Sequence, residues 1–302
     1  MEELIIPAPA KINLALDIRG LLPDGYHQLE MIMQSINLHD LIYLKKTRKA
    51  EIKLSSTDTS LPDGPENLAY QAAELLLKRD NSGPGLEIFI QKNIPVAAGL
   101  AGGSTDAAAV LKGMNILFGL KIGREKLQEL GASIGSDVPF CIRGGTVLAR
   151  GRGDELYQLP DLSLRGLVLI VPPVRVSTAQ IYQEYDRLSL SENVPVERLV
   201  AMIKKKREIS WNEGWDNVLE RVTMRLLDDI QEIKELLSEM GSKFCLMSGS
   251  GPAVFSISDS QKVEFIVKNW PRKKDSVFAI QTVGKDFKEL WRKNNYEKGW
   301  LK

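Results

Sequence analysis

The sequence predicts an α+β protein of two domains. Its 302 residues exceed the usual size of one domain, which is about 150 residues. The first half opens with β-rich segments and then changes to helical spacing, whereas the second half contains elements in the order β-α-β-β-α-β. That order is the split βαβ pattern of ferredoxin-like folds. We therefore expect an N-terminal domain over residues 1–160 and a ferredoxin-like C-terminal domain over residues 161–302.

The elements of the first half follow from hydrophobic periodicity. Residues 12–18 alternate in part between apolar and polar side chains, and 31–44 is a second extended, β-rich segment. Leucine and alanine recur at helical spacing over 66–78, and 85–91 is typical of a strand. The N-terminal domain is thus expected to begin with strands and to continue with helices.

The elements of the second half give the split βαβ order. A Pro-Pro break at 172–173 separates the first strand from a long helical stretch, and a Gly-Ser-Gly turn separates two later strands. We expect strands at 166–171, 244–248, 253–258 and 277–283, and helices through 215–240 and at 261–269.

Composition and charge exclude several classes of protein. Forty basic against thirty-nine acidic residues give a net charge of +1, so neither nucleic acid nor an anionic membrane is an expected partner. Cys141 and Cys245 lie far apart without a Cys-x-x-Cys motif, which argues against a disulfide framework or a cysteine-rich zinc site. The N-terminus lacks a basic signal region and no apolar run approaches the ~18 residues of a membrane span. We expect a cytoplasmic protein.

The residues available for catalysis argue against zinc-dependent and serine-nucleophile enzymes. His27 and His39 are the only histidines, so there is no His-Glu-x-x-His zinc motif, and no Gly-x-Ser-x-Gly frames a nucleophilic serine. The chemistry is therefore expected to depend on groups other than a zinc ion or a catalytic triad.

A loop of small residues before an alanine-rich helix is the most informative segment. A ligand can approach its backbone closely, and the free N–H groups of a helix that begins near Ser104 form an anion site. The hydroxyls of Ser104 and Thr105 can cap the helix, contact phosphate or reach a metal ion, although small residues also permit a simple tight turn. The segment matches neither Gly-x-x-x-x-Gly-Lys-[Ser/Thr] nor Gly-x-Gly-x-x-Gly. The loop comprises Pro95, Val96, Ala97, Ala98, Gly99, Leu100, Ala101, Gly102, Gly103, Ser104 and Thr105.

Three motifs in order along the chain resemble those of the GHMP kinase superfamily. They are Pro7 to Leu16, Pro95 to Ala109 and Leu246 to Phe255. The resemblance implies an N-terminal domain similar to ribosomal protein S5 and a ferredoxin-like C-terminal domain. It also implies that the central loop, residues 95–105, binds the phosphates of ATP, with Mg²⁺ as the accompanying ion. No residue stands out as a ligand of that ion.

Two further segments resemble one branch of the superfamily closely. They are Asp-Gly-Tyr-His at 24–27 and Gly-Ser-Asp-Val-Pro-Phe at 135–140. That branch uses ATP to phosphorylate the tertiary 2-hydroxyl of a cytidine-diphosphate-linked methylerythritol, a small-molecule substrate of the non-mevalonate isoprenoid route. The alternatives are a homoserine- or mevalonate-type kinase of the same superfamily, or a catalytically silent relative that acts as a binding module.

The resemblance assigns the catalytic roles to two residues. Lys11 is expected to lie beside the acceptor oxygen and the incoming phosphoryl group, where its ammonium offsets charge. Asp137 is expected to receive the proton of the acceptor hydroxyl, although by spacing alone it reads as a helix cap. Asn13 is expected to contact hydroxyl groups of the acceptor.

The resemblance also predicts a pocket for the cytosine base. Tyr26 follows a turn, where its ring can stack on a base while His27 hydrogen-bonds the base edge. Tyr182 matches the second aromatic residue of this pocket, with Tyr185 as the alternative.

Overall fold

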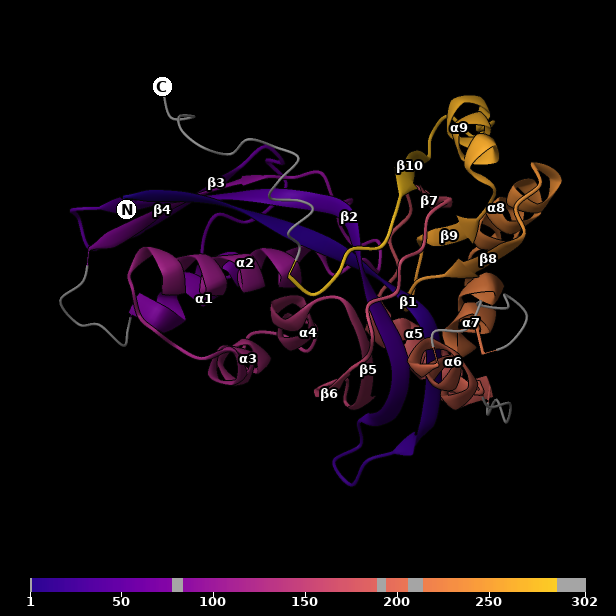
Figure 1. Ribbon diagram of the computed structural model, residues 1–302, viewed down its shortest axis with the longest axis horizontal. Helices are drawn as coiled ribbons and strands as arrows, with labels where there is room; N and C mark the ends of the chain where they lie inside the picture. The colour runs from indigo at the N-terminus through magenta and orange to yellow at the C-terminus, as the bar shows by residue number, and fades with distance from the viewer. Residues whose placement is uncertain (1, 78–83, 189–193, 206–213, 287–302) are drawn as a thin grey trace.

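The computed structural model of the protein describes residues 2–77, 84–188, 194–205 and 214–286. These residues form two sheets with helices packed beside them (Figure 1). Within these ranges no helix combines the length and the apolar character needed to cross a membrane.

The N-terminal sheet is built on a long antiparallel hairpin. Strands β1 (Glu3–Leu21) and β2 (His27–Thr47) pair along most of their length. The pairing register shifts between Pro9 and Lys11 and again between Asn13 and Ala15. Such bulges redirect side chains and often occur beside active sites. The bulged stretch of β1 thus carries both Lys11 and Asn13.

Four shorter strands complete this sheet, and helices cover one of its faces. The order is β3-β4-β2-β5-β6, with β1 paired to β2. The helices α1 to α4 lie together on one side of the sheet (Figure 1). The strand bounds are Ile52–Ser56 for β3, Gly85–Gln91 for β4, Thr146–Gly151 for β5 and Glu155–Gln158 for β6. The helix bounds are Leu68–Leu77 for α1, Gly102–Leu117 for α2, Arg124–Ala132 for α3 and Val138–Arg143 for α4.

Small residues allow α2 to approach the sheet closely. Ala107, Ala108 and Ala109 are fully buried, and a Cβ atom on Gly113 would lie 2.4 Å from Cδ1 of Leu44 on β2. Because the helix packs this tightly, its N-terminal end is held firmly at the end of the sheet.

The C-terminal sheet has the order β10-β7-β9-β8 with antiparallel neighbours throughout. This is the arrangement that the split βαβ order predicts, so the mixed α and β fold with two sheets is confirmed. The strands are β7 (Leu167–Val171), β8 (Phe244–Met247), β9 (Val254–Ile257) and β10 (Ser276–Ile280). The helices are α5 (Thr178–Leu188), α6 (Val196–Lys204), α7 (Val218–Leu226), α8 (Asp228–Glu239) and α9 (Ser260–Asn269).

Three details differ from the expectation. The stretch 215–240 forms two helices, because Leu227 between α7 and α8 has an extended backbone. Helices α5 and α6 were not predicted. Helix α2 begins at Gly102 rather than near Ser104. The first sheet ends at Gln158 and the second begins at Leu167, so a domain boundary at residue 160 stays a prediction.

Backbone and side-chain hydrogen bonds join the two halves of the chain. The Leu16 amide on β1 donates to the Asp216 carbonyl at 2.9 Å. The buried Asn217 side chain donates to the carbonyls of Met247 at 2.9 Å and Gly249 at 2.7 Å. One short segment therefore holds both β1 and the turn after β8, which fixes the position of that turn relative to the first sheet.

Candidate functional site

The three glycine- and proline-containing motifs meet at one place through backbone contacts. The Lys11 amide on β1 donates to the Leu100 carbonyl at 3.1 Å, and the Ala253 amide donates to the Ala98 carbonyl at 3.3 Å. The segments involved lie about 90 and 150 residues apart along the chain. The central loop, residues 95–105, is thus held between the first motif and the third.

Ser248 and Gly99 make this junction tight. The Asn13 amide donates to the Ser248 hydroxyl at 3.2 Å, and that hydroxyl donates to the Gly99 carbonyl at 3.4 Å. Gly99 has a φ of 74°. A Cβ atom there would lie 2.7 Å from the carbonyl oxygen of Ser248 and 2.9 Å from that of Gly251. Both the backbone conformation and the space available require glycine at position 99.

The central loop stores backbone strain on both sides of Gly99. Ala97 and Ala101 also have positive φ values, 57° and 58°, and the left-handed conformation costs an L-residue about 1–2 kcal/mol. Strain of this kind concentrates at ligand sites. Ala101 is also the N-cap of α2 and supplies no side-chain capping bond, so its side chain leaves the first amides of the helix available for an anion.

The structure separates the two hydroxyls at the start of α2. Thr105 is only 1% exposed, and its hydroxyl donates to the Pro9 carbonyl at 2.8 Å. That hydroxyl therefore connects α2 to β1. A Cβ atom on Gly135 would lie 3.9 Å from Oγ of Ser104, so the Ser104 hydroxyl lies toward the segment that carries Asp137.

The loop borders two separate hollows. Gly99 and Ala101 line the main cavity, which has a volume of about 800 Å³, and Pro95 and Val96 line a second hollow of about 440 Å³. The side chains of Ala98 and Leu100 are buried in the core, so these two residues can offer only backbone groups to a ligand. The residues predicted to bind the donor therefore face two neighbouring spaces.

Lys11 and Asn13 form a hydrogen-bonded pair in the wall of the main cavity. Both side chains are buried, and Nζ of Lys11 donates to Oδ1 of Asn13 at 2.6 Å. A Cβ atom on Gly249 would lie 3.3 Å from each of these two atoms. Glycine at the third motif therefore leaves the ammonium room to face the cavity.

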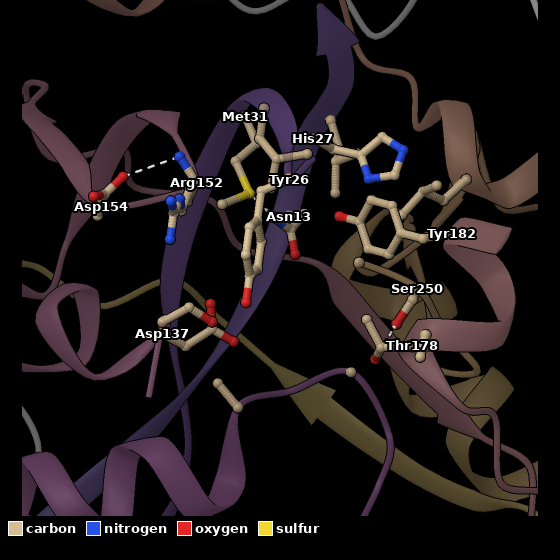
Figure 2. A pocket seen from close by; sticks show the side chains of 18 of the residues that line it. Asn13, Tyr26, His27, Met31, Asp137, Arg152, Asp154, Thr178, Tyr182 and Ser250 are labelled. Atoms are coloured by element: carbon tan, nitrogen blue, oxygen red, sulfur yellow. Dashed lines mark hydrogen bonds between the residues drawn. The ribbon is translucent and has the colours of Figure 1, made fainter. Parts of the chain in front are cut away.

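Asp137 lines the same cavity at the beginning of α4 (Figure 2). It is the N-cap residue of that helix, but its side chain makes no capping bond. Burial raises the pKa of the nearby Cys141 thiol to about 12, and the negative charge of Asp137 contributes to that rise. The carboxylate is thus not used as a helix cap, and its role as a base stays a prediction.

Two aromatic residues from different elements line the other part of the main cavity. Tyr26 belongs to the turn between β1 and β2, and Tyr182 belongs to α5 (Figure 2). The Arg152 guanidinium lies 4.3 Å from the centre of the Tyr26 ring and forms an ion pair with Asp24. Burial raises the pKa of Tyr182, and the charge of Asp137 raises it further, so its phenol stays neutral. The Tyr26 ring is exposed, whereas the Tyr182 ring is half-buried.

His27 packs on the Tyr182 ring. Its ring centre lies 4.7 Å from that of Tyr182 with an interplanar angle of 35°, and its Nε2 lies 2.7 Å from Oδ1 of Asp186. Tyr185 meets His27 edge-on at 6.0 Å and does not belong to the cavity lining. Of the two tyrosines that the sequence left open, Tyr182 is the one that faces the cavity.

Family models match the segments that carry the central and third motifs. Residues 67–145 match the model of the GHMP kinases N terminal domain, and residues 198–276 match that of the GHMP kinases C terminal. The chain belongs to the GHMP kinase family. GHMP kinases use ATP as the phosphoryl donor, so membership of this family identifies ATP as the donor.

Relatives with one shared name cover nearly the whole chain. The chain is 45% identical to the 4-diphosphocytidyl-2-C-methyl-D-erythritol kinase of Bacillus pumilus, over 92% of this chain and 96% of that protein. It is 43% identical to the enzyme of the same name from Bacillus subtilis, again over 92% and 96%. These matches confirm the branch of the GHMP kinases that the motifs indicated.

Solved structures give the same family. A crystal structure of 4-(cytidine 5'-diphospho)-2C-methyl-D-erythritol kinase matches with a TM-score of 0.80 and 30% identity, over 93% of this chain and all of that chain. Homoserine kinase from Cytophaga hutchinsonii matches with a TM-score of 0.73 at 20% identity, over 94% of this chain and 96% of that one. At that identity the likeness shows a common fold alone.

Several residues of this GHMP kinase's cavity were not predicted. Arg152 and Asp154 reach it from the turn between β5 and β6, and Thr178 and Ser250 are hydrogen-bonded to each other at 3.0 Å beside it. Ser250 lies in the third motif, and this position could have predicted that it lines the cavity. Arg152 has no motif of its own, because only tertiary folding brings it to Tyr26.

The described residues contain no group of three or more His, Cys, Asp or Glu side chains placed to hold a metal ion. Mg²⁺ commonly uses one or two carboxylates together with substrate phosphates and water. A cavity with single carboxylates such as Asp137 therefore fits an Mg²⁺ ion that is carried mainly by the nucleotide.

We expect Gly99→Ala to lower the free energy of unfolding more than Gly119→Ala. The two glycines have φ values of 74° and 67°, so both substitutions incur the left-handed cost of about 1–2 kcal/mol. A Cβ atom on Gly119 meets nothing within 4 Å, whereas one on Gly99 meets the Ser248 carbonyl. Urea denaturation should show a further loss of about 1 kcal/mol or more in Gly99→Ala, and calorimetry should show weaker binding of an ATP analogue. Equal losses in the two variants would contradict a tight junction at Gly99.

Proposed function

We propose that this protein transfers the γ-phosphoryl group of ATP, accompanied by Mg²⁺, to the tertiary 2-hydroxyl of 4-diphosphocytidyl-2-C-methyl-D-erythritol. The observation that carries the proposal is that one cavity combines Lys11 and Asp137 with the aromatic pair Tyr26 and Tyr182, beside the central loop. This product belongs to the non-mevalonate isoprenoid route. The relatives at 43–45% identity support the same assignment.

The donor is assigned to the central loop. The phosphates of ATP lie along residues 99–104. There the glycines let the phosphates approach the backbone closely, and the N-terminus of α2 favours their negative charge. The Ser104 hydroxyl adds a donor on that side. The nucleoside end then occupies the hollow beside Pro95 and Val96, which the same loop borders. Bound Mg²⁺ supplies charge stabilisation at the phosphates.

Lys11 and Asp137 carry the chemical step. The Asp137 carboxylate accepts the proton of the acceptor hydroxyl as that oxygen forms its bond to the γ-phosphorus, and the bond from the γ-phosphorus to the bridging oxygen breaks to release ADP. The Lys11 ammonium offsets the negative charge of the transferring group. Asn13 holds that ammonium at 2.6 Å, so the charge stays in one position.

The aromatic part of the cavity binds the cytosine base. Tyr26 and Tyr182 offer stacking surfaces, and His27 offers a polar atom for the base edge. When the His27 ring is neutral and its Nε2 donates to the Asp186 carboxylate 2.7 Å away, Nδ1 is left as an acceptor. The exocyclic amine of cytosine is a donor, whereas uracil has an acceptor at that position. This arrangement favours cytidine over uridine.

Asp137→Asn should lower kcat while leaving the protein folded and able to bind ATP. The amide keeps the shape of the carboxylate but cannot take a proton. A positioned base contributes roughly 10²–10⁴-fold, and a loose transition state places the loss toward the lower end of that range. The measurement is steady-state kinetics with a folded-state check by circular dichroism.

The matched control for this variant is Asp154→Asn, which removes a negative charge from the same cavity wall. Asp154 accepts a hydrogen bond from the Arg152 amide at 2.9 Å, so it has a structural role in its turn. A kcat loss of the same size in both variants would show that the loss comes from removing a negative charge from the cavity, and not from losing proton acceptance by Asp137.

Tyr26→Ala should raise KM for the cytidyl substrate and leave KM for ATP unchanged. Stacking on a base contributes about 1–3 kcal/mol, which corresponds to roughly a tenfold to hundredfold change. Tyr157→Ala is the control, because Tyr157 is similarly exposed at 49% against 60% for Tyr26 and also lies near an arginine, Arg150, but outside the cavity. An unchanged KM for the cytidyl substrate in Tyr26→Ala would remove Tyr26 from the base pocket.

A further inference from the structure

A third hollow, part of whose lining is exposed to solvent, lies away from the catalytic cavity. We call it the far cavity; it has a volume of about 310 Å³, near the lower end of the range for small-molecule pockets. It lies among the start of β1, the helices α2, α3 and α4, and the segment at 285–286. These helices are grouped on one face of the N-terminal sheet (Figure 1). Its apolar lining consists of Ile6, Pro7, Ile116, Ile122, Leu127 and Ile142.

The polar lining of the far cavity is mainly cationic. Lys112, Arg124 and Lys285 line it together with a single acid, Asp286, and Asn115. Arg124 and Asp286 are 3.9 Å apart, a distance at the limit of an ion pair. Arg124 also begins α3, and the N-terminus of a helix favours an anion. Among the described residues that line this space, three cations stand against one carboxylate, which makes it electrostatically suited to a negative group.

Lys112 is held inside the cavity wall. Its Nζ donates to the Cys141 carbonyl on α4 at 3.2 Å. Burial lowers the pKa of Lys112 to about 8, and the positive charge of Arg124 lowers it further. Two positive groups that disfavour each other in a partly apolar cavity are both stabilised when an anion lies between them.

We propose that the far cavity binds a small anionic amphiphile, with a phosphate head at Lys112, Arg124 and Lys285 and a short apolar chain against the isoleucines. The proposal is independent of the function assigned to the catalytic cavity. The site nevertheless connects to that cavity through two helices. Lys112 lies on α2 and its hydrogen-bond partner lies on α4, and the opposite ends of these helices carry the central loop and Asp137.

The direct test is calorimetry with hexyl phosphate as the probe. The protein is first saturated with a non-hydrolysable ATP analogue, so that the central loop is occupied. We expect hexyl phosphate to bind with a stoichiometry of one, at least tenfold more tightly than inorganic phosphate or hexanol. Inorganic phosphate lacks the apolar chain, and hexanol lacks the phosphate group. Absence of binding under these conditions, or equal affinity for inorganic phosphate, would overturn the proposal.

Surface variants keep the test independent of folding. Arg124→Gln changes a side chain that is 49% exposed and should weaken hexyl phosphate binding about tenfold. Lys126→Gln is the matched control, since this residue lies on the same helix, is 53% exposed and pairs with Glu129. Lys126→Gln should bind as the wild type does. Equal binding by Arg124→Gln and Lys126→Gln would contradict the site.

A pH series tests whether Lys112 contributes to hexyl phosphate binding. Among the described residues, the other charged groups that line this cavity are Arg124, Lys285 and Asp286, and the Cys141 thiol lies beside Lys112. Between pH 7 and pH 9 a phosphate ester stays dianionic, because its second pKa is about 6. The affinity of the wild type should therefore fall as the pH rises through about 8, where Lys112 loses its proton. Lys112→Met should bind more weakly and show no such fall; the same fall in Lys112→Met would remove Lys112 from the site.

Discussion

The junction between the bulged part of β1 and two glycine-rich turns determines the rest of the site. The Lys11 amide is bonded to the Leu100 carbonyl, and the Ser248 hydroxyl bridges the Asn13 amide and the Gly99 carbonyl. Since these bonds use backbone groups and one small hydroxyl, the segments approach to contact distance. The Lys11 backbone is consequently fixed beside the central loop, and its ammonium is held by Asn13.

The same junction explains why the cavity draws on both sheets. Asn217 holds the turn at Gly249 through two carbonyls, and that turn borders Lys11 and Asn13 on the cavity wall. Helix α5 of the second half contributes Tyr182, while the β1–β2 turn of the first half contributes Tyr26. The aromatic part of the cavity is thus assembled from both halves of the chain.

Local sequence patterns predicted many of the strands and helices, whereas the features that were missed depend mainly on tertiary contacts. Strand β4 occupies the predicted residues 85–91, because its boundaries coincide with a change in periodicity. The sequence could not separate Ser104 from Thr105, since only the packing of α2 on Pro9 assigns the Thr105 hydroxyl to the core. Arg152 was missed for the same reason: its contact with Tyr26 spans 126 residues of sequence. Helices α5 and α6 were missed although both are amphipathic, so their periodic signal was present in the sequence and was not used.

The central claim is that this junction serves phosphoryl transfer to an acceptor recognised by its cytosine base. ADP release by the wild-type protein, measured with one acceptor at a time, tests it most directly, with 4-diphosphocytidyl-2-C-methyl-D-erythritol, its uridine counterpart, homoserine and mevalonate as the acceptors. The account predicts acceptor-dependent ADP release with the cytidine compound, with a product heavier by one phosphoryl group, and at least tenfold lower kcat/KM for the other three. Comparable ADP release with homoserine or mevalonate, or none with the cytidine compound, would contradict it.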